Sequence, residues 1–331
     1  MKFSAAAVTL LGLGLILVNL TGFCYGALQV GFYKGKCLTA DVETIVAGVV
    51  RTRFVTDQTI VAALLRLQFH DCFVKGCDAS ILLDGTSSEK TAPPNLSVRG
   101  YDIIDQAKAA VEKICPGVVS CADIIAIATR DAVSLSGGLK YSVQTGRRDG
   151  LISLASNVNL PSPSISVSQS VAAFAQKRLS PTDMVLLLGG HTVGITHCSF
   201  IKNRLYNFNN TGKPDPTMDT SLAKALRLRC PQNSNTDNTI NLDQNTASSL
   251  TVDNSYYKQL LLKKGILQID QALTLDPSTN ATVVSFASGS KFPVQFGNAM
   301  VKLGAIEVIT DPADRQGEIR RSCRATNKVS I

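Results

Sequence analysis

An arginine and a histidine four residues apart are the side chains of this sequence best suited to proton chemistry. Arg66 and His70 lie in the segment LLRLQFHDCFVKGCDAS, whose apolar spacing predicts a helix, so both would occupy one helix face. A fixed cation lowers the pKa of a neighbouring imidazole and leaves a base beside a positive charge. Such a pair can accept a proton and stabilise developing negative charge, as cleavage of an oxygen–oxygen bond requires. A buried histidine beside a surface arginine would have the same spacing.

The residues after His70 have the chemistry of a calcium site. Asp71, Asp78 and Ser80 carry hard oxygen ligands, and Gly76 lets the chain turn carbonyl groups inward. A disulfide between the two cysteines of this segment would close a loop that holds the acids together. We therefore favour a bound cation over solvated loop acids.

A second histidine has the surroundings of an iron ligand. His191 follows an apolar helical stretch and two glycines in LLLGGHTVGITHC, and Gly-Gly allows another plane to approach the backbone closely. An iron-ligating imidazole needs an acid partner for its other ring nitrogen, and Asp270 lies in the otherwise apolar segment GILQIDQAL. A structural histidine and a helix-capping aspartate are the alternatives. The third histidine, His197, is predicted to be structural or exposed.

Composition favours a soluble protein of two lobes. The 331 residues are 45% hydrophobic and 18% charged, with a formal net charge of +8. The positive charge is spread without a long basic run, which favours contact with acidic polysaccharide and argues against nucleic-acid binding. Residues 1–27 contain Lys2, an apolar run and small residues at Gly26 and Ala27, which indicates a cleaved secretion signal more than a membrane anchor.

Cysteine number agrees with export. Of the nine cysteines, Cys24 lies in the predicted signal, and the other eight form an even set that indicates four disulfides in an oxidising compartment. Spacing alone leaves about 105 pairings open. A zinc site is disfavoured because no CxxC pair occurs. Among the N-x-S/T sites, Asn209 in a polar loop is the best glycan acceptor, whereas Asn95 is expected to be buried.

The hydrophobic pattern is mostly helical and shows little strand alternation. Ser120 and Ser180, each with an aspartate three residues later, are expected to begin helices. A junction between lobes is expected within residues 150–168, giving a distal lobe at 28–165 and a proximal lobe at 166–331. Helices are expected at residues 42–54, 59–73, 100–114, 120–135, 164–178, 180–190, 221–230, 254–265 and 280–305.

Together these stretches resemble the secretory class III haem peroxidases of plants, from Phe32 to about Asn327. The resemblance rests on these segments in this order: LLRLQFHDCFVKGCDASILLD, APPNLSVRGYDIID, CPGVVSCADIIAIATRDAV, TGRRDG, NLPSPS, GGHTVGITHC, VDNSYY, GILQIDQAL and GEIRRSCRATN. It implies a mainly α-helical, two-lobed fold with one haem b between the lobes and two calcium ions. It also implies a monomer, secreted to the cell wall rather than the vacuole, that oxidises phenolic donors with hydrogen peroxide in two one-electron steps.

The resemblance assigns roles on the peroxide side of the haem. His70 would take a proton from hydrogen peroxide and return it to the leaving oxygen, whose charge Arg66 would stabilise. Phe69 would line the wall of the pocket. Asn95 would hydrogen-bond His70 and fix its tautomer, and Glu89 would support Asn95.

On the other side, the resemblance makes His191 the axial iron ligand, hydrogen-bonded to Asp270. Phe200 would contact the haem, and the carbonyl of Pro161 would position phenolic donors. The resemblance also pairs one arginine of TGRRDG with Asp123, a structural role. The chain has no tryptophan, which excludes electron transfer through a surface tryptophan.

The implied calcium sites and disulfides involve larger sets of residues. One ambiguity concerns the second site: nine residues separate Asp243 from Asp253, where the family pattern has seven, so Thr246 and Ser248 compete for one ligand position. The first calcium would be held by Asp71, Val74, Gly76, Asp78 and Ser80, and the second by Thr192, Asp243, Thr246, Thr251 and Asp253. The disulfides would join Cys37–Cys115, Cys72–Cys77, Cys121–Cys323 and Cys198–Cys230.

Two other functions remain to be weighed. One is a haem-free, secreted wall-binding protein on the same scaffold, which the retention of Arg66, His70, Asn95, His191 and Asp270 disfavours. The other is a calcium-stabilised hydrolase that uses His70 with Asp71. It lacks a recognisable serine or cysteine nucleophile motif.

Overall fold

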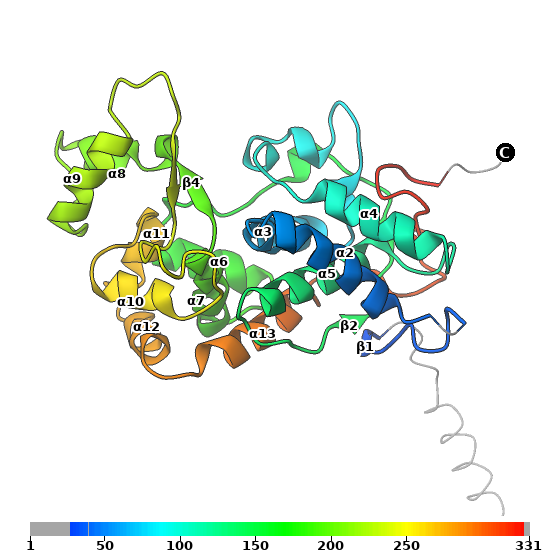
Figure 1. Ribbon diagram of the computed structural model, residues 1–331. Coiled ribbons are helices and arrows are strands. Elements are labelled where there is room, and N and C mark those ends of the chain that lie inside the picture. The colour runs from blue at the N-terminus through cyan, green and yellow to red at the C-terminus, as the bar shows by residue number, and fades with distance from the viewer. Residues whose placement is uncertain (1–26, 39, 328–331) are drawn as a thin grey trace, which may run out of the picture.

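The computed structural model describes residues 27–38 and 40–327, and most of these lie in helices (Figure 1). The predicted signal falls almost wholly on residues 1–26, outside the described residues. The mainly α-helical fold is confirmed. The α-helices are α2 (Val42–Thr56), α3 (Ile60–Lys75), α4 (Tyr101–Glu112), α5 (Cys121–Leu135), α6 (Val167–Gln176), α7 (Pro181–Leu188), α8 (Lys202–Tyr206), α9 (Thr220–Arg229), α10 (Ser255–Leu261), α11 (Gln268–Ala272), α12 (Asn280–Ala287) and α13 (Phe292–Leu303).

Strands are short and form three antiparallel pairs within the described residues. These pairs join segments far apart in sequence, so they hold loops next to one another but are too short to form a hydrophobic core. They are β1 (Gln29–Val30) with β2 (Gln144–Thr145), β3 (Asp149–Gly150) with β6 (Gly317–Glu318), and β4 (Ile195–His197) with β5 (Thr239–Asn241).

Helix starts follow the sequence signals. The Ser120 hydroxyl accepts a hydrogen bond from the Asp123 N–H at the start of α5, and Ser180 forms a capping box with Asp183 at the start of α7. α6 begins at Val167 and not at 164, because Ser166 makes a capping box with Gln169.

The prediction of one helix over residues 280–305 is wrong. α12 ends at Ala287 and α13 begins at Phe292. Gly289 between them has φ +79°, a left-handed conformation that ends helices. Pro293 lies in the first turn of α13, where its missing N–H costs no hydrogen bond.

Packing divides the helices into two groups. α2 packs against α4 and α5, and α3 packs against α5, whereas α7 packs against α6, α12 and α13, and α10 against α12. α3 connects the groups through contacts with α13 and with the 3-10 helix Gly189–Thr192 (η5). The lobe boundary between residues 165 and 166 stays a prediction. No helix in the described part of the chain combines the length and apolar character needed to cross a bilayer.

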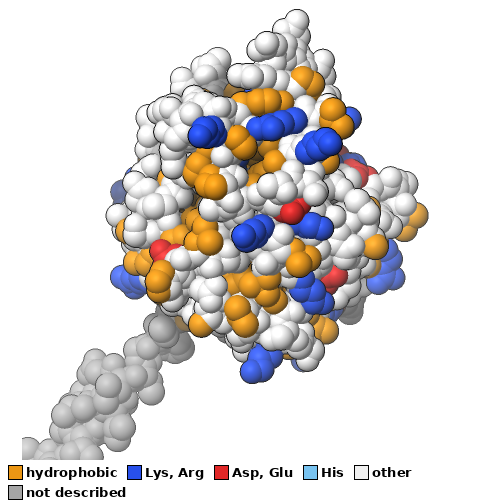
Figure 2. Space-filling model, turned by 90° about the vertical axis from the view of Figure 1, so that its left-hand side faces the viewer, with side chains coloured by type: hydrophobic (Ala, Val, Ile, Leu, Met, Phe, Trp, Pro, Cys, Tyr) orange, Lys and Arg blue, Asp and Glu red, His pale blue; other side chains and the backbone are white. Residues whose placement is uncertain are grey.

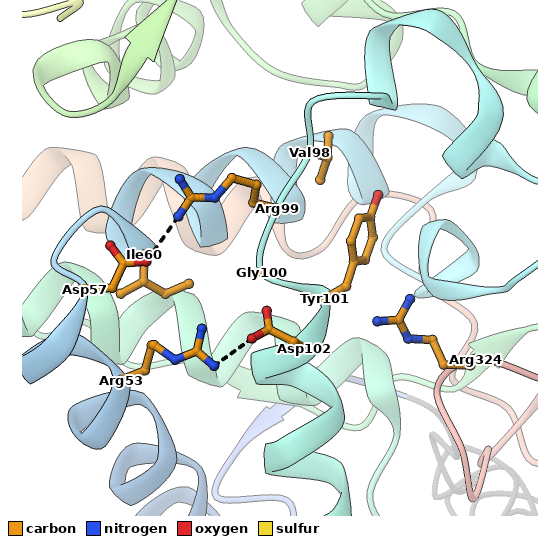
Figure 3. A pocket seen from close by; sticks show the side chains of 9 residues that line it. All are labelled: Arg53, Asp57, Ile60, Val98, Arg99, Gly100, Tyr101, Asp102 and Arg324. Atoms are coloured by element: carbon orange, nitrogen blue, oxygen red, sulfur yellow. Dashed lines mark hydrogen bonds and ion pairs between the residues drawn. The ribbon is translucent and has the colours of Figure 1, made fainter.

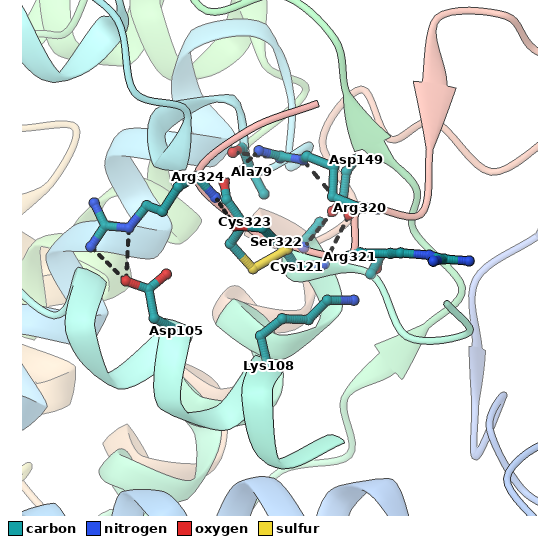
Figure 4. Close-up of a disulfide and its surroundings, with 12 residues drawn as sticks. Ala79, Asp105, Lys108, Cys121, Asp149, Arg320, Arg321, Ser322, Cys323 and Arg324 are labelled. Atoms are coloured by element: carbon teal, nitrogen blue, oxygen red, sulfur yellow. Dashed lines mark hydrogen bonds and ion pairs between the residues drawn. A yellow bond between two sulfur atoms is a disulfide. The ribbon is translucent and has the colours of Figure 1, made fainter. Parts of the chain in front are cut away.

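The four disulfides are those that the resemblance implies: Cys37–Cys115, Cys72–Cys77, Cys121–Cys323 and Cys198–Cys230. Cys121–Cys323 joins the first residue of α5 to the C-terminal segment over a separation of 202 residues (Figure 4). The segment therefore returns to the helices formed by the first half of the chain.

The Cys121–Cys323 bridge is predicted to contribute more stability than the Cys198–Cys230 bridge. Removing the first by Cys121→Ala with Cys323→Ala releases a far longer loop, for which chain entropy gives a loss of about 5 kcal/mol against about 4 kcal/mol for Cys198→Ala with Cys230→Ala. Chemical denaturation of the two double variants measures the difference. Equal losses would contradict the loop-length account.

Candidate active site

One segment, residues 94–97, orients both Arg66 and His70 of α3. The Arg66 guanidinium donates to the Pro94 carbonyl at 2.8 Å and to the Ser97 hydroxyl at 3.0 Å. His70 Nδ1 lies 2.6 Å from Asn95 Oδ1. Because the amide oxygen is an acceptor, Nδ1 carries the proton and Nε2 keeps a free lone pair.

Asn95 is itself held by the backbone of Glu89. The Asn95 amide donates to the Glu89 carbonyl at 2.8 Å, and Asn95 is buried. The expected support from Glu89 therefore comes through its main chain. Its carboxylate oxygens have no hydrogen-bond partner among the described residues, and burial raises the pKa of Glu89 to about 7.

The environment of His70 keeps it neutral. Burial and, to a smaller extent, the Arg66 charge lower the pKa of His70 to about 3, although the Asn95 hydrogen bond opposes both. Above that pH the imidazole is a neutral base beside a cation. This is the arrangement that the four-residue spacing suggested.

Phe69 lies in an aromatic cluster next to His70. Its ring stacks on Phe73 with centroids 4.7 Å apart and on Phe174 of α6 at 6.1 Å. These contacts fix the side of α3 that carries His70 against α6.

His191 lies in η5, directly after α7, and shares a carboxylate with a tyrosine. His191 Nδ1 is 2.8 Å from Asp270 Oδ1, and the Tyr256 hydroxyl donates to the same oxygen at 2.9 Å. Burial alone would lower the pKa of His191, but the charge and hydrogen bond of Asp270 raise it above its ordinary value. With Nδ1 engaged, and the side chain 29% exposed, Nε2 is the nitrogen left to bind a metal.

The glycines before His191 have a packing role. A side chain at Gly189 would collide with the Tyr257 hydroxyl and with Phe292, so the absence of Cβ lets η5 lie against α10 and α13. Tyr257 donates to the Val185 carbonyl at 3.0 Å, which ties α10 to α7. Protein contacts therefore explain Gly189, whereas a side chain at Gly190 would meet only Phe296, at an ordinary van der Waals distance.

The two histidines belong to neighbouring elements. α3 contacts η5, and the Arg66 charge acts on both imidazoles: it adds to the lowering of the His70 pKa and opposes the rise of the His191 pKa. The donors fit a haem: one imidazole has a carboxylate-oriented free nitrogen, and another is a neutral base beside a cation.

Two other predicted site residues, Pro161 and Phe200, are more exposed to solvent than His70. Pro161 is partly exposed, and its loop is held to α11 because the Pro163 carbonyl accepts from the Ile269 N–H at 3.0 Å, next to Asp270. Phe200 is 57% exposed. Among the described residues, the ring partners of His70 and His191 are Phe69 and Tyr256, and Phe200 forms a ring pair with neither histidine.

The predicted first calcium site holds two buried acids close together. Asp71 Oδ2 accepts from the Ala79 N–H at 3.0 Å, and Asp78 Oδ1 accepts from the Ser80 N–H at 2.9 Å. Burial, then the charges of Asp78 and Glu89, raise the pKa of Asp71, and burial raises that of Asp78. Asp71 Oδ1 and the Ser80 hydroxyl have no partner among the described residues. Unpartnered buried oxygens beside like charges fit a bound cation.

The backbone of this loop is fixed by neighbours. Gly76 ends α3 with φ +104°, and a side chain there would collide with the Glu307 carbonyl. The Val74 carbonyl accepts from Lys177 Nζ at 3.1 Å. Since no group of three or more His, Cys, Asp or Glu side chains suited to a metal occurs in the described residues, a cation here also needs hydroxyl and carbonyl ligands.

The predicted second calcium site is partly assembled. The Thr192 hydroxyl donates to Asp253 Oδ1 at 3.1 Å, and its oxygen lies 3.4 Å from the Thr251 carbonyl oxygen. Asp243 is fully buried, which raises its pKa. Its Oδ2 accepts from the Ser248 hydroxyl at 3.3 Å.

Other expectations concern residues outside these sites. Asp123 is buried and pairs with Arg147 at 2.7 Å. Asn95 is buried, as expected, and Asn209 is in an irregular stretch with φ +50°. The side chain of His197 is 41% exposed. Sequence reasoning missed Tyr256, although the segment VDNSYY was noted, because nothing in the sequence says that its hydroxyl reaches Asp270.

Comparisons with known proteins agree with this geometry. The family model described as Peroxidase matches residues 46–289. The chain is 54% identical to peroxidase 60 of Arabidopsis thaliana over 98% of both chains, and 49% identical to peroxidase 57 of the same plant over 95% of this chain and 97% of the relative. It is 45% identical to peroxidase N1 of Nicotiana tabacum over 90% of both chains.

The chain therefore belongs to the peroxidase family, and its resemblance to the plant class III haem peroxidases is confirmed. It is a hydrogen-peroxide-dependent oxidoreductase.

Two adjacent tyrosines offer a matched test of the shared carboxylate. Burial raises the pKa of Tyr256 well above its usual value, so its hydroxyl stays a donor to Asp270. Tyr256→Phe removes a hydrogen bond to a charged group and should lower the free energy of unfolding by about 2 kcal/mol. The control Tyr257→Phe removes a bond to a neutral carbonyl and should cost about 1 kcal/mol. Denaturant titration measures both, and a smaller loss for Tyr256→Phe would contradict the assignment.

Proposed function

We propose that this peroxidase oxidises small phenols in two one-electron steps, consuming one hydrogen peroxide and releasing two waters and two phenoxyl radicals. Haem b, when bound through His191 Nε2, supplies the iron that exchanges electrons with peroxide and donor. The observation that carries the proposal is the pair of oriented imidazoles: His70 on Asn95 and His191 on Asp270, with Arg66 acting on both.

His70 moves the proton of the first step. Its Nε2 accepts a proton from one peroxide oxygen and returns it to the other, which leaves as water. Asn95 keeps the other ring nitrogen protonated, so the lone pair always faces the reactant. The Arg66 guanidinium, held by Pro94 and Ser97, stabilises the negative charge of the departing oxygen.

Asp270 sets the character of His191. A carboxylate that accepts from Nδ1 orients the ring and makes Nε2 a stronger ligand. Tyr256 donates to the same oxygen and so reduces the charge available to His191.

Two calcium ions would hold loops in place, one next to His70 and the other next to His191. The first would use the carboxylates and hydroxyl of Asp71, Asp78 and Ser80 with the carbonyls of Val74 and Gly76. For the second, the contact with Asp243 supports Ser248 over Thr246, whose carbonyl instead accepts from Ser249 at 3.4 Å. The remaining ligands would be Thr192, Thr251 and Asp253.

Phenolic donors would reach the haem edge near Pro161, and the lobes at 28–165 and 166–331 would enclose the haem. The predicted signal and four disulfides support secretion to the cell wall as a monomer. A net charge of +8 supports retention by acidic polysaccharide, and Lys and Arg outnumber Asp and Glu on the face over α8–α10 and α12 (Figure 2). The haem-free binding protein is disfavoured, because it would need neither oriented imidazole.

Substituting His70 tests the proposed proton transfer. His70→Ala should lower the rate of reaction with hydrogen peroxide by about 10²- to 10⁴-fold, because no other described base has the same position. The control is His197→Ala, which removes a largely exposed imidazole and should leave the rate unchanged. Stopped-flow measurement gives the rates, and an unaltered Soret absorption shows that haem is bound. A His70→Ala rate equal to that of the parent would refute the proposal.

Removing calcium tests the role of residues 71–80, called here the acidic loop because they contain Asp71 and Asp78. A chelator should lower peroxidase activity before the helices unfold, because Asp71 and Asp78 then repel each other beside His70. Activity and far-ultraviolet circular dichroism measured on one sample compare the two events, with metal content checked by atomic absorption. Full activity after verified loss of both ions would contradict a positioning role for calcium.

A further inference from the structure

The carboxylate that orients His191 is carried by a very short helix. α11 comprises only Gln268–Ala272, and its N-cap Leu267 makes no side-chain hydrogen bond to the first turn. A helix of this length is not stable by itself, because its few internal hydrogen bonds do not offset the loss of chain entropy. The position of Asp270 within α11 is therefore set by contacts with other parts of the chain.

A buried arginine of α8 supplies such contacts directly before α11. Arg204 is 2% exposed, and its Nη1 lies within hydrogen-bond distance of three consecutive carbonyl oxygens. The distances are 2.7 Å to Gly265, 2.7 Å to Ile266 and 3.1 Å to Leu267. One guanidinium thus restrains the three peptide groups that lead into α11.

The restrained segment is joined to α11 by a side chain of the helix. Gln271 Oε1 accepts from the Gly265 N–H at 3.0 Å, and Gln271 Nε2 donates to the Leu260 carbonyl at 3.1 Å. A side chain at Gly265 would lie 3.0 Å from Gln271, so the absence of Cβ permits this close approach. Because Gln271 follows Asp270, the position of residues 265–267 determines the position of the carboxylate.

The Arg204 guanidinium is itself held in place. Its Nε donates to Asp215 Oδ2 at 2.8 Å, and both side chains of this ion pair are almost completely buried. Asp215 Oδ1 accepts from the N–H and the hydroxyl of Thr217 at 2.8 and 2.6 Å. A buried charge that loses its partner is costly, so the guanidinium stays beside Asp215.

An arginine–aspartate pair on the surface shows the contrast. Figure 3 shows Arg53 and Asp102 at a groove around Gly100, where their side chains are 28% and 57% exposed and a single guanidinium nitrogen makes the bond. Solvent and salt screen such a pair, and its contribution to stability is small. The Arg204 pair is buried and also bonds the main chain, so it can fix the path of the backbone.

We propose that Arg204 is a positioning residue for the proposed iron ligand. It holds residues 265–267 so that α11 presents Asp270 Oδ1 to His191 Nδ1 at 2.8 Å. The inference rests on the proposed binding of haem iron by His191 Nε2. A carboxylate that accepts from Nδ1 strengthens the ligand at Nε2, so displacement of α11 would weaken the bond from His191 to iron.

Resonance Raman spectroscopy of the reduced, haem-loaded protein tests this role through the iron–histidine stretching frequency, which rises with the ligand strength of the imidazole. Arg204→Lys keeps a positive charge beside Asp215 but loses the planar guanidinium that reaches the carbonyls. Its frequency should fall part of the way towards that of Asp270→Asn, in which the charge acting on His191 is absent.

The matched control is Arg147→Lys. Arg147 also forms a buried pair, with Asp123 at 2.7 Å, but it bonds the carbonyls of Gln144 and Gly304 and not the segment before α11. This variant loses the same guanidinium from a buried pair and should leave the frequency unchanged.

Asp215→Asn is a second and milder variant, which decides the matter if Arg204→Lys does not take up haem. It leaves Arg204 in place with a neutral partner, so the frequency should fall by a smaller amount. A purely structural role would lower the denaturation midpoint and leave the frequency equal to that of the parent, and this result would overturn the proposal. Absence of the iron–histidine band from the parent would instead refute the proposed function, so the two failures are distinguishable.

Discussion

The buried guanidinium of Arg320 is the constraint on which the first half of the molecule depends. A charged side chain that is buried from solvent needs hydrogen-bond partners. The Arg320 guanidinium donates to the carbonyls of Cys323, Ala79 and Asp78 (Figure 4). Its main-chain N–H donates to Asp149, whose carboxylate also accepts from the Cys121 and Ala122 N–H groups at the start of α5. One arginine therefore joins the C-terminal segment, the acidic loop and α5, and the Cys121–Cys323 bridge makes the connection covalent.

This connection reaches the proposed chemistry through the acidic loop. Arg320 holds the carbonyl of Ala79, and the Ala79 N–H donates to Asp71, the residue after His70. Arg320, 250 positions later in the chain, thereby supports the part of α3 that carries His70, the residue to which we assign proton transfer. The loop also places Asp71 beside Asp78, where burial and like charge make a bound cation favourable. The stability of this region and the proposed proton transfer would thus depend on the same contacts.

The sequence predicts contacts between residues close together on one helix much better than contacts across loops. The spacing of Arg66 and His70 suffices to place both on α3, and Ser120 and Ser180 begin their helices as side-chain caps should. The helix break near Gly289 was missed because apolar periodicity continues through α12 and α13, so the local glycine and proline signals were outweighed. The choice between Thr246 and Ser248 could not be made from spacing, since the path of an irregular loop decides which hydroxyl reaches Asp243.

One oxygen of Asp270 accepts hydrogen bonds from both His191 and Tyr256, and the second bond affects the first. A carboxylate with a single donor concentrates its charge on that donor and would tend to draw the proton away from His191 Nδ1. The Tyr256 hydroxyl takes part of that charge, because both groups bond Oδ1. Its own proton is held firmly, since burial and the nearby carboxylate raise the pKa of Tyr256 well above its usual value. With Nδ1 donating to Oδ1, the orientation of the His191 ring is fixed and Nε2 remains the free ring nitrogen. The neighbouring Tyr257 donates to the Val185 carbonyl and so holds α10 against α7. The two tyrosines therefore have different roles: Tyr256 acts on the charge of Asp270, and Tyr257 acts on helix packing.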